Sequence, residues 1–72
     1  MLLTEALYIT ENIIGKRTGA YCLGNKGMKV CIDVYANQKD MAEIKREIED
    51  YLQQQVTIEP VGKTVEHWHI IF

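Results

Sequence analysis

The fold is decided by one stretch of the chain, residues 28–55, which reads MKVCIDVYANQKDMAEIKREIEDYLQQQ. In Met28–Ala36 apolar residues alternate with polar ones, which predicts a β-strand with one buried face. In Gln38–Gln54 apolar residues recur at intervals of three and four, which predicts an amphipathic α-helix. Asn37 lies between the two and carries a side-chain oxygen that can cap the helix. The buried side of this helix is expected to contain Met41, Ile44, Ile48, Tyr51 and Leu52.

The residues before this stretch predict a helix and a hairpin strand. Leu2–Ile14 is predicted to be helical and to end at Gly15, a residue type that is common at helix C-caps. Tyr8 and Ile9 lie outside its main apolar stripe, which indicates either a broad apolar face or a helix that contacts more than one neighbour. The stripe consists of Leu3, Ala6, Leu7, Thr10, Ile13 and Ile14. Thr18–Leu23 is predicted to be extended and to join the main strand through a turn at Gly24–Gly27.

Two registers of this hairpin fit the turn residues. A two-residue loop places Cys22 opposite Lys29. A three-residue loop with Gly27 as the left-handed residue places Cys22 opposite Val30. We favour the second register because it requires a positive φ only at a glycine. Cys22 would then lie on the buried face and Cys31 on the other, so the two thiols could not form a disulfide.

Two further strands are predicted after the second helix. Val56–Glu59 is short and precedes Pro60, which cannot donate a ladder hydrogen bond, so we expect an edge strand there. Thr64–Phe72 is apolar on both faces, a pattern that is typical of a central strand.

The predicted order is therefore helix, strand, strand, helix, strand, strand. This order predicts one α+β domain over residues 1–72, a two-layer sandwich of a four-stranded, mainly antiparallel sheet with two helices on one face. One arrangement of this kind is a circularly permuted ferredoxin-like fold, with Thr64–Phe72 and Met28–Ala36 as a central pair that runs parallel. The alternative is two hairpins paired in another order under the same helices.

One face of this sheet is expected to lack a helical cover. The side chains expected on it are Lys29, Cys31, Asp33, Tyr35, Val65, His67, His69 and Ile71. A face with this many apolar and aromatic residues is typical of a binding surface. We therefore expect a small non-catalytic protein-binding module that acts through this face or a sheet edge, as a homodimer or as an inhibitor or adaptor of a partner protein. The expected partner-binding residues are Tyr35, His67, His69, Ile71 and Cys31.

A metal site is the alternative interpretation of the same face. His67 and His69 point to the same side of a strand because they are two positions apart. Cys31 or Asp33 on the neighbouring strand could add a third ligand for zinc, nickel or copper. The expected metal set is His67, His69 and Cys31, and no other cofactor is expected. Since these residues form no tight spacing motif, structural or interface histidines remain the favoured interpretation.

Nucleic acid binding is a third interpretation. It rests on four basic residues in a window without acidic ones: Lys16, Arg17, Lys26 and Lys29. The whole chain has eight Lys and Arg residues against ten Asp and Glu residues, a net charge of −2. This balance provides no general attraction to phosphate, so a nucleic acid partner is not expected.

The remaining features predict location and the absence of catalysis. Glu5 and Glu11 interrupt the apolar N-terminal run, so neither a signal peptide nor a membrane span is expected. Two cysteines without an export signal favour reduced thiols and a cytoplasmic location. We do not expect an enzyme, because no nucleophile lies beside a base and no paired acid and base are apparent.

Overall fold

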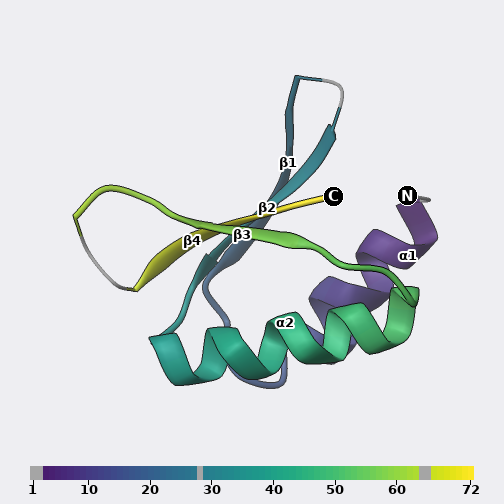
Figure 1. Ribbon diagram of the computed structural model, residues 1–72, viewed down its shortest axis with the longest axis horizontal. Coiled ribbons are helices and arrows are strands. Elements are labelled where there is room, and N and C mark those ends of the chain that lie inside the picture. Colours follow the sequence, from purple (N-terminus) through teal and green to yellow (C-terminus); the bar gives the residue numbers. More distant parts are fainter. Residues whose placement is uncertain (1–2, 28, 64–65) are drawn as a thin grey trace.

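The computed structural model describes residues 3–27, 29–63 and 66–72 of the chain. Its elements are α1 (Leu3–Tyr8), a π-helical segment η1 (Ile9–Ile14), β1 (Tyr21–Lys26), β2 (Lys29–Tyr35), α2 (Gln38–Leu52), β3 (Thr57–Pro60) and β4 (His67–Ile71). The strands form one layer and the helices form the other (Figure 1). The predicted α+β class, with helices on one face of a four-stranded sheet, is confirmed. The predicted boundaries at Leu2, Met28 and Thr64 lie outside the described residues.

The strands lie in the order β1-β2-β4-β3, and all neighbours are antiparallel. β2 and β4 are the central pair and β3 is an edge strand, as predicted. The prediction that the central pair runs parallel is wrong. The chain returns through α2 so that β3 runs in the direction of β2, and the turn after β3 then reverses β4 against both. This order is the one that a circularly permuted ferredoxin-like sheet requires, and that relationship stays a prediction.

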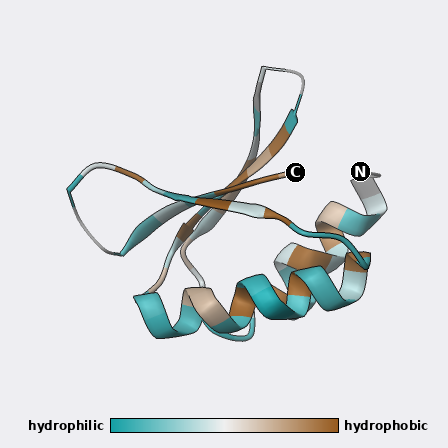
Figure 2. Cartoon of the chain, in the orientation of Figure 1, coloured by the Kyte–Doolittle hydropathy of each residue, from teal (hydrophilic) through white to brown (hydrophobic). Residues whose placement is uncertain are grey.

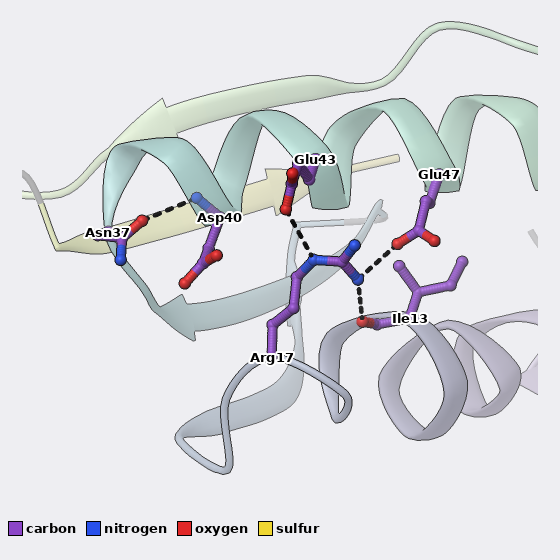
Figure 3. Close-up of polar contacts among 6 residues, drawn as sticks. All are labelled: Ile13, Arg17, Asn37, Asp40, Glu43 and Glu47. Atoms are coloured by element: carbon purple, nitrogen blue, oxygen red, sulfur yellow. Dashed lines mark hydrogen bonds and ion pairs between the residues drawn. The ribbon is translucent and has the colours of Figure 1, made fainter.

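Helix α2 begins where its sequence predicts. The side-chain oxygen of Asn37 accepts a hydrogen bond from the backbone N–H of Asp40 at 2.8 Å, which is the expected N-cap (Figure 3). The helix ends at Leu52, two residues before the predicted end. Gln53 then takes a left-handed φ of 56° without a glycine, and its amide Nε2 donates a hydrogen bond to the carbonyl of Asp50.

The first helix changes from α to π geometry at Ile9. A π turn holds more residues than an α turn, so residues four and five positions apart come to the same side. Ile9, Ile13 and Ile14 are therefore buried together. The predicted stripe, which assumed α spacing, is wrong in placing Leu7 inside and Ile9 outside, because Leu7 is exposed and Ile9 is fully buried.

Gly15 is the C-cap of this helix, as predicted, and two backbone carbonyl groups lie close to it. Its N–H donates to the carbonyl oxygen of Thr10 at 2.9 Å, which completes the last π turn. Its φ of −61° is right-handed, so any residue could adopt its backbone conformation. A Cβ atom at this position would, however, lie 2.9 Å from the carbonyl oxygen of Glu11.

The core lies between the sheet and the helices. It consists of Ile9, Ile13, Ile14, Ile32, Val34, Met41, Ile44, Ile48, Val56 and Ile70. In Figure 2 hydrophobic residues recur at intervals along α2 and also lie along β3 and β4. The expectation that Tyr51 belongs to this core is wrong: it is 41% exposed and stacks on Tyr8 at the outer surface of the helices.

The β1–β2 hairpin has neither of the two predicted registers. β1 continues to Lys26, which pairs with Lys29, so Cys22 lies opposite Asp33. Gly27 has the predicted left-handed φ, at 66°. Gly24 and Asn25, which were predicted to turn, are instead paired with Cys31 and Val30 of β2. Cys22 therefore lies on the same face of the sheet as Cys31, and the prediction of opposite faces is wrong.

Neither helix of the described chain is long and apolar enough to cross a membrane.

Candidate functional site

The open face of the sheet, the face that the helices do not cover, is built from alternate residues of β2 and β4. The register places three pairs of residues side by side on it: Cys31 with Ile71, Asp33 with His69, and Tyr35 with His67. Of the residues between them, Ile32, Val34 and Ile70 are fully buried on the helical side, and Trp68 is partly buried against the same core. The predicted face of these six residues is therefore confirmed, and their role in binding stays a prediction. Val65 lies outside the described residues.

The edge strands extend this face on both sides. On β1, Cys22 lies opposite Asp33, and on β3, Glu59 lies opposite His69. One row across all four strands is thus Cys22, Asp33, His69 and Glu59. Every residue of this row carries a group that can bind a metal or form a hydrogen bond.

The side chains of Asp33, His67 and His69, which we call the Asp-His-His cluster, converge on one point of the open face. The Oδ1 atom of Asp33 lies 3.0 Å from Nε2 of His67 and 2.5 Å from Nε2 of His69. The ligand atoms of all three residues lie within 4.8 Å of one another. All three side chains are partly buried, so water screens their interactions less than it would on a fully exposed surface.

Aromatic packing holds one side of this cluster. The ring of Tyr35 stacks on the imidazole of His67, with ring centroids 4.1 Å apart and planes 10° apart. The imidazole of His69 meets that of His67 edge-on, at 5.6 Å. The orientation of His67 is thus fixed by its neighbours as well as by Asp33, while 53% of Tyr35 remains exposed.

The residues proposed from sequence as metal ligands are only partly brought together. His67 and His69 converge with Asp33, whereas Cys31 is buried and does not belong to this group of three. Asp33 is the alternative third ligand predicted from its position on the same face of the strand. The choice between Cys31 and Asp33 depended on the strand register, which the local pattern does not provide.

The four basic residues predicted for nucleic acid lie in two separate places. The backbones of Lys26 and Lys29 are paired at the end of the β1–β2 hairpin, which projects away from both helices (Figure 1). Lys16 and Arg17 follow the first helix. Arg17 is engaged within the protein: its guanidinium contacts Glu47 at 2.6 Å and Glu43 at 3.4 Å on α2 and donates a hydrogen bond to the carbonyl of Ile13 (Figure 3).

A scan of protein-family models, a search of curated proteins and a search of solved structures each found no match to this chain. Because an α+β architecture occurs with many functions, the function has to be argued from the open face itself.

Proposed function

We propose that this protein is a small non-catalytic binding module of the cytoplasm that self-associates through the open face of its sheet. The observation that carries the proposal is Tyr35. Among the described residues it is the most exposed large hydrophobic side chain, and it is stacked on His67. A tyrosine that is already held in place loses little conformational entropy on binding, so it is suited to anchor an interface.

The chemistry of the open face favours a second copy of the chain as the occupant. A two-fold interface places the same patch of each subunit against itself. The carboxylate of Asp33 can accept a hydrogen bond and the phenol O–H of Tyr35 can donate one, so the patch contains both halves of the interactions it would need. Ile71 adds an apolar side chain beside them. Such a patch can be self-complementary without placing equal charges in contact.

The test compares Tyr35→Ala with Tyr8→Ala, since both tyrosines are about half exposed and both are stacked on another ring. Tyr8 is 44% exposed and stacks on Tyr51 in the helical layer, away from the open face. The mass of each variant is measured over a range of protein concentrations in the presence of chelator. We expect a dimer whose dissociation constant rises about tenfold or more with Tyr35→Ala, as for an interface hot spot, and does not change with Tyr8→Ala.

Two outcomes would overturn this proposal. A wild-type protein that stays monomeric at every concentration would exclude self-association, and the face would then have to bind a different protein. An equal effect of the two tyrosine variants would place the interface elsewhere. Circular dichroism of each variant shows whether it is folded, and Ile71→Ala provides a second substitution on the open face.

A further inference from the structure

We propose that the Asp-His-His cluster is a binding site for one divalent transition-metal ion, and that zinc suits its ligands best. This site goes beyond the self-association proposed above and does not depend on it, because all three ligands belong to one chain. The ligand set is two imidazole nitrogens and one carboxylate oxygen, a combination that zinc takes readily in proteins.

The distances in the cluster suit a metal ion after a small outward movement. Zinc binds imidazole and carboxylate ligands at about 2.0–2.2 Å, which places neighbouring ligand atoms of a tetrahedral site about 3.3 Å apart. Oδ1 of Asp33 already lies 3.0 Å from Nε2 of His67 and 2.5 Å from Nε2 of His69. Each of these two carboxylate–imidazole pairs therefore needs to widen by less than about 1 Å to admit the ion, and the ligand atoms of all three residues lie within 4.8 Å of one another.

The backbone of the cluster is held by the two central strands. His67 and His69 project from one side of β4, and Asp33 projects from the paired position of β2. Beneath them, Ile32 and Ile70 are paired with each other and fully buried, which fixes the register. The stack of Tyr35 on His67 restricts one imidazole further. Such a preformed site loses less entropy when it binds an ion than flexible surface residues would lose.

The fourth position of a tetrahedral ion would point away from the sheet. No helix of the described chain covers this face, so an ion can enter and a water molecule or another small ligand can complete the coordination. Three protein ligands with one open position are typical of sites whose metal exchanges ligands, whereas purely structural zinc sites have four.

A simpler arrangement of the same side chains makes a different prediction about the protons. If the histidines only donate hydrogen bonds to Asp33, both rings carry a proton on Nε2. If they bind a metal through Nε2, those protons are absent and each ring is protonated on Nδ1 instead. The imidazole resonances of the wild-type protein in the presence of zinc therefore distinguish the two arrangements without any substitution.

The experiment uses the full chain stripped of metal by chelator, with zinc as the probe and calorimetry and native mass spectrometry as readouts. We expect one zinc ion per chain, whether the chain is a monomer or a dimer. Asp33→Asn and His69→Gln should each weaken binding at least tenfold. Asp50→Asn, on the exposed surface of α2, makes the same chemical change away from the cluster and should leave binding unchanged.

Cobalt distinguishes Asp33 from the cysteines as the third ligand. A Co²⁺ site with nitrogen and oxygen ligands shows visible d–d absorption without the near-ultraviolet band of a cobalt–thiolate bond. We expect no such band and no effect of Cys31→Ser on the affinity. A thiolate band that disappears with Cys31→Ser would overturn the assignment to Asp33.

Three further results would overturn the site itself. They are a wild-type protein that takes up no zinc, zinc binding that is insensitive to both Asp33→Asn and His69→Gln, and imidazole resonances of His67 and His69 that do not change on zinc addition. The last measurement needs no variant, so it decides even if a substitution prevents folding. A monomer that binds zinc would leave this inference standing while excluding the proposed self-association.

Discussion

The carboxylate of Asp33 lies 3.0 Å from the imidazole Nε2 of His67, although 34 positions of sequence separate the two residues. They meet because β2 and β4 are adjacent in the sheet, with Asp33 paired to His69 and Tyr35 paired to His67. A slip of one strand by one residue would turn its side chains to the opposite face. The open face therefore depends on the core residues that hold this register.

The two faces of the sheet should respond differently to substitution. Ile32→Glu places an unpaired charge in the core, which costs about several kcal/mol. Because this is a large part of the stability of a domain of this size, the variant should unfold. Ile71→Ala, on the open face, should leave the protein folded. Circular dichroism and urea denaturation measure both. A cooperatively folded Ile32→Glu variant would contradict the assignment of faces.

The cap of α2 should contribute measurably to stability. Asn37→Ala removes the acceptor for the backbone N–H of Asp40 and should lower the free energy of unfolding by about 1 kcal/mol. Asn37→Ser keeps a capping oxygen and serves as the matched control. Urea denaturation measures the difference, and equal losses for the two variants would show that the cap is not the cause.

Gly15 should be sensitive to a single added carbon atom. Gly15→Ala places a Cβ atom 2.9 Å from the backbone carbonyl oxygen of Glu11, so the last π turn must shift, at a cost of about 1–3 kcal/mol. Gly19→Ala meets no atom within 4 Å and should change stability little. Thermal denaturation of the two variants tests this contrast. If Gly15→Ala is as stable as Gly19→Ala, the close approach is not a constraint.

Arg17 should act in the fold rather than on nucleic acid. It joins Glu43 and Glu47 of α2 to the end of the first helix, and Arg17→Gln should lower the free energy of unfolding by about 1 kcal/mol. Arg46→Gln removes an exposed arginine of α2 and should have a smaller effect. Salt-sensitive binding of single-stranded RNA or DNA that is lost with Arg17→Gln, without loss of stability, would contradict this role.

The stability of the protein should decrease at acid pH because of Glu49. The ammonium of Lys45 and the backbone N–H of Val56 donate hydrogen bonds to its carboxylate, which hold its pKa below the ordinary value of 4.5. Since the pKa of Glu49 is lower in the folded state, its charge stabilises the fold. This stabilisation is fully present above the pKa of the unfolded state and is lost as the pH falls through the pKa of the folded state.

The matching variant is Glu49→Gln. At neutral pH the wild-type protein should have the higher melting temperature, and the difference should shrink as the pH falls below about 4.5. Glu11→Gln, an exposed residue of the first helix, is the control. A difference that is constant from neutral to acid pH would show that the charge of Glu49 does not contribute.

The sequence by itself determined which segments are helices and which are strands, and the face on which each residue of the two central strands lies. Alternation in β2 separates Ile32 from Asp33, helical spacing in α2 selects Ile44 and Ile48, and Asn37 marks the helix start. These features depend on contacts between residues close in the chain, so the local pattern is sufficient to predict them. The same alternation predicted that Asp33, His67 and His69 lie on one face of the sheet.

Tertiary structure alone decided the hairpin register, the direction of β4 and the π geometry of the first helix. Cys22 pairs with Asp33 because β1 continues through Gly24 and Asn25 along the sheet edge. Ile9 is buried because its helix widens. These outcomes depend on contacts between segments that are far apart in the chain. A local sequence pattern is compatible with more than one arrangement of such segments, so it does not decide between them. The convergence of Asp33 with His67 and His69 is of this kind, because it requires one register between strands that lie far apart in the chain.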